Sequence, residues 1–438
     1  MKRNILILAV AALAALMVNI KAEDISFERL SAGVGEIRAE SSNIPDPFPA
    51  AAEISKTTPA APPEWLILIF INGVNNLGIA GFADKNINAM EKIGSTDKVA
   101  VVTEFRTLGR DPDSFNITFP RASNTILIQK DDLPSIITSE LIASNNDKDM
   151  GSADHFVRFA RRNIRKFPGA KKVAIILWNH GGGRAGIAWD DVSGHHMEVD
   201  QLGQALSKIK GELKHKIDIF ATDACLMQMA EVVYELKDSV SVIVGSEELI
   251  PGDGYPYDKI LAPLVANPGM SDEALGKLIV DAYGTHYSAT NTATLSALRT
   301  SALPGFLSLL NNWVQAVTAD AEAFKAATAE RMVNRIYDFP HDERSAKRQD
   351  SKDLYDYLSN VGRSLPDGTA AVTAGSALKE YIANDLIIRK TAMAPKAHGL
   401  AIHIPDLQYE SGNYQKFAFT KDSEWARFIK LITEERLK

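Results

Sequence analysis

Five short runs of consecutive apolar residues set the strongest limit on the fold of this chain. They are WLILIFING (65–73), KVAVVTEFR (98–106), KVAIILWNHG (172–181), IDIFATDAC (217–225) and VSVIVGSEE (240–248). The runs are rich in Val and Ile, and a strand accommodates their length better than a helix does. Continuously apolar strands are typical of sheets that are covered on both faces, as parallel sheets are. The runs therefore predict a buried, mostly parallel sheet.

Helical patterns alternate with these runs. They cover ADHFVRFARRNIRKFPG (153–169), LGQALSKIKGEL (202–213), LMQMAEVVYEL (226–236) and most of residues 270–390. Alternating strands and helices predict an α/β fold, with helices on both faces of a mostly parallel central sheet.

The C-terminal part is mainly helical and is expected to return a strand to that sheet. HGLAIHIPD (398–406) has the apolar character of such a strand. The charged stretch HDERSAKRQDSKD (341–353) is interpreted as a solvated loop.

The N-terminus has the layout of a secretory signal peptide, predicted over residues 1–22. Lys2 and Arg3 precede an apolar run over residues 5–18, and Ala22 is a plausible cleavage residue. The alternative is an uncleaved membrane anchor, but the run is shorter than the ~20 residues that cross a bilayer. Residues 23–62, rich in Pro and Ala, are interpreted as a linker or prosegment. We expect an exported protein, periplasmic or extracellular, that is not bound to a membrane once the signal is removed.

Charge and cysteine content narrow the function further. The formal net charge is -7, which argues against a nucleic-acid partner. Cys225 is the single cysteine, so no internal disulfide can form. Its thiol is either inertly buried or reactive.

Two groups with catalytic chemistry lie at the ends of predicted neighbouring strands. His180 directly follows AIILWN and Cys225 directly follows IDIFATDA, with one helix-sized segment between them. Because functional groups gather at the carboxyl ends of parallel strands, we expect the two side chains to open onto one edge of the sheet. His180 would act as a base for Cys225, and a helix starting at Leu226 would lower the pKa of the thiol.

Three glycines follow the histidine. Gly181, Gly182 and Gly183 allow the main chain to approach a substrate closely. The N–H groups of Gly181 and Cys225 are therefore candidates for an oxyanion hole. The alternative is an ordinary strand-to-loop turn that carries a hydrogen-bonded histidine.

WNHGGG (178–183) together with TDACLMQMAE (222–231) resembles the clostripain family of cysteine peptidases. The resemblance extends over roughly residues 65–430 and includes AWDDVSGHHMEVDQLGQAL, SEELIPGDGYPY, DLYDYL, HGLAIHIP and YQKFAFTKDSEWARFI. It implies a caspase-like three-layer sandwich, with a catalytic core over residues 63–268 and a helical part over 269–438 that completes it. It also implies a Cys225–His180 dyad that hydrolyses peptide bonds in proteins or peptides after Arg or Lys.

A substrate guanidinium or ammonium that becomes buried needs a carboxylate partner. Asp223, at the end of the strand that precedes Cys225, is the first candidate, and capping of the following helix is the alternative role. Asp253 matches an acidic position in the pocket loop of the family. Since Gly252 and Gly254 flank it, an ordinary turn aspartate is the alternative.

No cofactor is expected to be required. Asp190 and Asp191 are weak candidates for calcium ligands, since carboxylates suit this ion and the family includes members helped by it. Two alternative functions stay open. One is a caspase-like peptidase with a different specificity, and the other is a secreted binding protein that keeps the fold without catalysis.

Overall fold

The structure, a computed structural model, describes residues 61–434 except 111–116, 119, 121, 147, 291–292, 332–350, 392 and 406–413. The predicted signal peptide and nearly all of the predicted prosegment lie outside the described residues. Within the described part of the chain, no helix is long and apolar enough to cross a bilayer.

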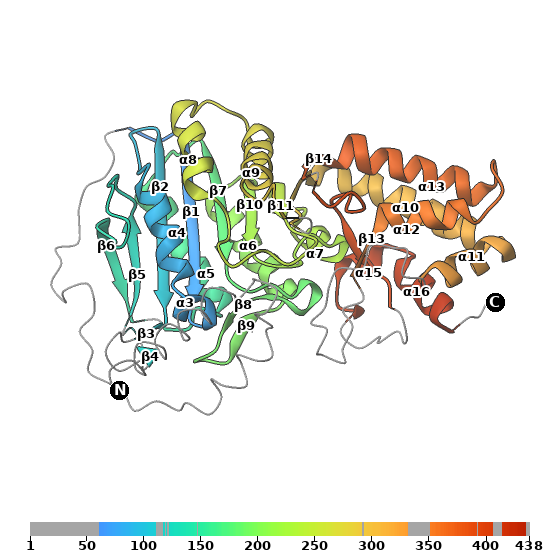
Figure 1. Ribbon diagram of the computed structural model, residues 1–438, viewed down its shortest axis with the longest axis horizontal. Helices are drawn as coiled ribbons and strands as arrows, with labels where there is room; N and C mark the ends of the chain where they lie inside the picture. The colour runs from blue at the N-terminus through green and yellow to red at the C-terminus, as the bar shows by residue number, and fades with distance from the viewer. Residues whose placement is uncertain are drawn as a thin grey trace, which may run out of the picture.

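A nine-stranded sheet forms the centre of the molecule, in the order β14-β12-β11-β10-β7-β1-β2-β5-β6 (Figure 1). Its five parallel strands are the five apolar runs: β1 (Trp65–Gly73), β2 (Val99–Thr107), β7 (Lys172–Trp178), β10 (Ile217–Asp223) and β11 (Val240–Gly245). Antiparallel strands extend both edges: β5 (Ser123–Leu127), β6 (Glu140–Asn145), β12 (Ser296–Arg299) and β14 (Ile387–Lys390). The sheet is thus mostly parallel in its middle, as predicted.

Helices cover both faces of the sheet, because alternate residues of each buried strand point to opposite sides. Leu66, Leu68 and Phe70 of β1 belong to one hydrophobic core, and the alternating residues Ile67 and Ile69 belong to the other. The first core includes α5 (Ala153–Lys166), α6 (Val199–Leu213) and α7 (Ala230–Leu236), and the second includes α4 (Phe82–Glu91), α8 (Tyr257–Ala266) and α9 (Asp272–His286). The three-layer α/β class is confirmed.

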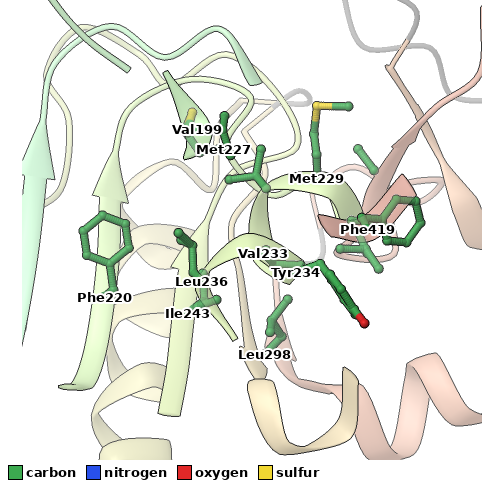
Figure 2. Packing of buried hydrophobic residues seen from close by; sticks show 14 of the residues in the cluster. Val199, Phe220, Met227, Met229, Val233, Tyr234, Leu236, Ile243, Leu298 and Phe419 are labelled. Atoms are coloured by element: carbon green, nitrogen blue, oxygen red, sulfur yellow. The ribbon is translucent and has the colours of Figure 1, made fainter. Parts of the chain in front are cut away.

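The C-terminal helices lie beside the β14 edge of the sheet (Figure 1). They are α10 (Leu303–Thr318), α11 (Ala321–Arg331), α12 (Leu354–Arg363), α13 (Ala370–Tyr381), α15 (Ala418–Asp422) and α16 (Trp425–Glu434). Trp313, Tyr357 and Trp425 pack their rings together at the centre of this group. Figure 2 shows how α7 joins it to the sheet, with Phe220 and Ile243 on the strand side and Phe419 of α15 on the other side.

The smaller elements complete the chain path. They are α3 (Asn76–Ile79), β3 (Gly109–Arg110), β4 (Ile117–Thr118), β8 (Ile187–Asp190), β9 (His195–Met197), β13 (Ser351–Asp353), β15 (Ala401–His403), the 3-10 helices η2 (Gly183–Ala185) and η3 (Thr300–Ala302), and the π-helix η4 (Ile382–Leu386).

Two predictions for the C-terminal part were wrong in detail. The strand inside 398–406 is β15, which pairs with β13 in a separate two-stranded sheet, and β12 and β14 are the strands that return to the main sheet. Residues 351–353 are a buried strand rather than part of a solvated loop, and 341–350 lie outside the described residues. The charged residues of β13 tolerate burial because their polar atoms are hydrogen-bonded: the Lys352 ammonium, for example, donates to the Arg331 carbonyl oxygen at 2.6 Å.

Candidate active site

The register between β7 and β10 brings His180 and Cys225 together. Trp178 pairs with Asp223 at the carboxyl ends of these parallel strands, and each candidate residue lies two positions beyond its member of that pair. A Cβ atom added to Gly181 would lie 2.1 Å from the Cys225 carbonyl oxygen and 3.0 Å from its nitrogen. The two segments are therefore in main-chain contact, and this contact leaves no room for a side chain at position 181.

The predicted helix dipole at Cys225 was wrong, because α7 begins at Ala230 rather than at Leu226. Leu226 has a left-handed φ of 62°, and its N–H donates to the Glu248 carbonyl oxygen at 3.1 Å. This turn separates the cysteine from the helix.

The thiol lies under the loop that follows β11. Its Sγ accepts a hydrogen bond from the Ile250 N–H at 3.3 Å. Burial raises the pKa of Cys225 to about 11, and the neighbouring carboxyls of Glu248 and Asp223 contribute to this shift, so the prediction of a lowered pKa was also wrong. The side chain is a neutral thiol at pH 7.

His180 is oriented by a residue that the sequence analysis missed. Its Nε2 lies 2.6 Å from Oδ1 of Asn76. Burial lowers the pKa of His180 to about 4, so the ring is neutral at pH 7. Since the Asn76 oxygen accepts, Nε2–H of the neutral ring donates, and Nδ1 keeps the lone pair that a base needs.

Asn76 lies beside His180 because it follows the carboxyl end of β1. It is the first residue of α3, directly beyond β1, and Asn75 caps this helix by accepting from the Leu77 N–H at 3.0 Å. Because β1 pairs with β7, the carboxyl end of β1 lies beside the segment that carries His180. The pair Asn75–Asn76 after a predicted strand was the available signal in the sequence.

Three buried asparagines hold the chain around His180. The side-chain amides of Asn72, Asn75 and Asn179 all donate to the carbonyl oxygen of Trp189, at 3.1, 3.2 and 3.2 Å. These bonds tie the ends of β1 and β7 to β8. The position of His180 is thus fixed by main-chain and amide contacts on both sides.

The two predicted oxyanion-hole donors face no competing acceptor. Within the described residues, neither the Gly181 N–H nor the Cys225 N–H donates to another residue. The neighbouring turn forms a hydrogen bond within itself, because the Gly182 N–H donates to the Gly186 carbonyl oxygen at 3.0 Å. Their role as oxyanion-hole donors stays a prediction.

Asp223 is buried at the entrance to α8. Its Oδ2 accepts from the Tyr255 N–H and from the Tyr257 hydroxyl, each at 2.9 Å. Burial raises the pKa of this carboxyl to about 7, although both donors oppose the shift. Gly254, with a φ of 65°, passes so close that a Cβ there would lie 2.7 Å from Oδ2. These contacts place Asp223 against the loop of residues 251–254.

Asp253 belongs to the same loop, so the structure brings the two predicted pocket acids together. Its Oδ1 accepts from the Lys85 ammonium at 2.7 Å, and its carbonyl oxygen accepts from the Asn86 amide at 2.9 Å. The side chains of Asp253 and Lys85 are 42% and 61% exposed. Helix α4 therefore borders the predicted pocket, and no local sequence pattern indicates this contact.

The calcium candidates are in different environments. Asp190 is buried, with Oδ1 accepting from the N–H groups of Val192 and Ser193 and Oδ2 from that of Met150. Burial raises the pKa of Asp191 to about 6, and neighbouring Asp190 adds to the shift. No group of three or more His, Cys, Asp or Glu side chains that could hold a metal occurs among the described residues. Calcium binding stays a prediction.

The last residues around the site come from the C-terminal part. Gln228, three positions after Cys225, donates to the Ser296 hydroxyl at 2.9 Å, and its carbonyl oxygen accepts from the Ala401 N–H at 3.0 Å. Glu247, after β11, accepts from the Gly399 N–H at 2.8 Å. Segments of the C-terminal part thus support the loops beside the thiol.

Comparisons with known proteins agree with this geometry. The statistical model of the clostripain family matches residues 69–431. Clostripain from Hathewaya histolytica is 30% identical over 167 residues, a match that covers 33% of this chain and 29% of that relative.

Among solved structures, an inactive zymogen of a C11 protease from Parabacteroides distasonis has a TM-score of 0.61 at 18% identity, over 83% of this chain and 98% of that one. A secreted C11 cysteine protease from Bacteroides thetaiotaomicron, in complex with an irreversible peptide inhibitor, has a TM-score of 0.60 at 18% identity, over 83% and 99%. At this identity the two structures support the fold alone.

Proposed function

The chain belongs to the clostripain family of cysteine peptidases, and from this premise we propose that it hydrolyses peptide bonds after Arg or Lys through Cys225 and His180. The observation that carries the proposal is the register of β7 and β10, which sets the two residues side by side at the carboxyl edge of the sheet. The substrates would be proteins or peptides that present a basic residue before the scissile bond, called the P1 residue below.

The proposed reaction begins with both groups neutral. Sγ of Cys225 attacks the scissile carbonyl carbon while Nδ1 of His180 takes the thiol proton, and the Gly181 and Cys225 N–H groups stabilise the oxyanion. The C–N bond then breaks, and His180 returns the proton to the leaving amine. Water cleaves the resulting thioester, with His180 again as the base. Since the thiol pKa is raised and the histidine pKa is lowered, proton transfer accompanies the attack and does not precede it.

Specificity for a basic P1 residue would come from the two acids of the 251–254 region. Asp223 forms the buried end of the pocket and Asp253 its exposed side. A charge-assisted bond to a guanidinium or ammonium would offset the cost of burying that cation.

A panel of peptides that differ only at P1 tests this function. The peptides carry Arg, Lys, Asp, Asn or Leu and are assayed with and without thiol alkylation. Alkylation-sensitive cleavage after Arg or Lys is the expected result. Cleavage after another residue would leave the dyad in place but remove Asp223 and Asp253 as selectors. No cleavage at all, with or without calcium, would favour the binding protein on the same fold.

Export of the protein is part of the proposal. It is supported by the N-terminal pattern, in which Lys2 and Arg3 precede an apolar run and Ala22 is a plausible cleavage residue. N-terminal sequencing of the protein recovered from the native cell measures it, with a first residue near position 23 as the expected result. An intact Met1 terminus on membrane-bound protein would contradict export in favour of an anchor.

Asn76→Ala is expected to lower kcat about a hundredfold and to leave KM nearly unchanged, because His180 loses the acceptor that fixes its tautomer and orientation. Asn76→Asp keeps an acceptor but adds a charge that favours the imidazolium ion, so the acid limb of the kcat/KM profile should move to higher pH.

Asn88→Ala is the matched control, because it removes only a bond to the Asp84 carbonyl oxygen within α4. A purely structural role for Asn76 would lower stability in both Asn76 variants without moving the pH profile.

A further inference from the structure

We infer that Lys85 competes with the substrate for Asp253 and so sets how tightly a basic P1 residue binds. This inference rests on the proposed function, in which Asp253 is one of two acids that hold the P1 cation. Lys85 then acts as a specificity-determining residue, although it takes no part in the bond-breaking steps.

Residues on either side of Lys85 hold it close to Asp253. On one side of Lys85, Phe82 lies so close to the loop that a Cβ on Gly252 would be 2.7 Å from its ring. On the other side, the buried amide of Asn86 donates to the Asp253 carbonyl oxygen, and its Oδ1 accepts from the Trp178 indole N–H at 2.7 Å. Helix α4 is therefore held against the loop, and Lys85 is presented to Asp253 by a fixed backbone.

Helix stability does not account for a lysine at this position. Lys85 lies at the N-terminal end of α4, where the partial positive charge of the helix dipole disfavours a cation. The ammonium is exposed, and Asp253 is the one acid within 4.0 Å of it in the described part of the chain. The contact with Asp253 in the pocket loop is thus the ion pair that this lysine forms.

The ion pair of Lys85 and Asp253 changes the local charge around the P1 residue of a bound substrate. Asp223 is buried, so Asp253 is the one of these two acids that is exposed to an incoming chain. Lys85 already neutralises one of its oxygens. A P1 cation must displace the ammonium or bind beside a like charge, and exposed ion pairs are weak enough for displacement to occur.

The experiment compares Lys85→Met with the unmodified protein on peptides that differ only at P1, with Arg, Lys or the uncharged norleucine. Removing the competitor is expected to lower KM for the Arg and Lys peptides about five- to tenfold. The value of kcat should not change, and norleucine peptides should bind as before. The inhibition constant of benzamidine, an amidinium probe, should fall by a similar factor.

Lys259→Met is the matched control. Lys259 lies on α8, which packs against α4, and its exposed ammonium is 3.2 Å from Asp258. The substitution therefore removes the same charge from the same region without touching Asp253. An equal fall of KM in this control would show a general electrostatic effect and would overturn the role of Lys85.

Failure of this inference can be told apart from failure of the proposed function. If wild type cleaves after Arg or Lys and Lys85→Met leaves KM and benzamidine inhibition unchanged, the role of Lys85 is overturned and the proposed function stands. If neither protein cleaves basic peptides and the Cys225→Ala protein binds no benzamidine with or without Lys85, both are overturned.

Discussion

Cys225→Ala is expected to abolish peptide hydrolysis, lowering kcat at least about a thousandfold, because no other described group can replace the thiolate as nucleophile. The fold should survive. The thiol makes only long contacts with Ile250, accepting from its N–H at 3.3 Å and donating to its carbonyl oxygen at 4.0 Å, and alanine fits the same space. The measurement is kcat on the preferred peptide beside a thermal unfolding curve of each protein.

The control is Ser193→Ala, which changes an exposed residue of the β8–β9 turn. Ser246→Ala is unsuitable, because the Ser246 hydroxyl is buried and donates to the Thr294 carbonyl oxygen. The Ser193→Ala protein should retain full activity. Substantial hydrolysis by Cys225→Ala that alkylation no longer inhibits would reject the mechanism.

Asp223→Asn is expected to lower kcat/KM for Arg and Lys peptides about a hundred- to a thousandfold, because a buried P1 cation would lose its charged partner. In the unmodified protein, binding of such a cation favours ionised Asp223. KM for these peptides should therefore fall as the pH rises through about 7, and this dependence should disappear in the variant. Asp258→Asn, on the surface of α8, is the control for a change of charge alone.

The same variant has a predictable effect on stability. The folded-state pKa of Asp223 is about 7, above its unfolded value near 3.9, so the carboxyl favours the fold below about pH 4 and this contribution is lost as the pH rises through 7. The loss is on the order of 4 kcal/mol for a fully buried group. Denaturant unfolding between pH 5 and 8 should show a smaller decline for Asp223→Asn than for wild type. Equal declines would place the titrating group elsewhere.

The central strands could be predicted because burial on both faces demands continuously apolar runs, as in the stretch over residues 172–178. The antiparallel strands could not. Ser123–Leu127 and Glu140–Asn145 mix polar and apolar residues, and the first is buried because its Ser123 and Thr125 hydroxyls donate to the distant Glu104 carboxylate. The segment Ala401–His403 has the apolar character of a sheet strand, but its pairing with Ser351–Asp353 depends on where the chain returns.

The proximity of His180 and Cys225 was predictable for the same reason as the sheet. His180 and Cys225 each follow a strand directly, and parallel strands end at one edge. The start of α7 was misplaced because a left-handed residue, Leu226, interrupts a helical pattern that continues through it. The contacts of Asn76 and Lys85 join segments far apart in the sequence, and no local pattern reports them.

The hydrogen bonds that join Ser296, Gly399 and Ala401 to the loops around Cys225 have a consequence for biosynthesis. These partners emerge from the ribosome long after the cysteine does. Until those partners are present, the side chains of Gln228 and Glu247 remain hydrated, because burying a polar group without a hydrogen-bond partner costs free energy. The nascent chain thus has its nucleophile well before it has a finished site. We therefore expect hydrolysis to begin only after the segments that carry Ser296, Gly399 and Ala401 have been synthesised and have folded.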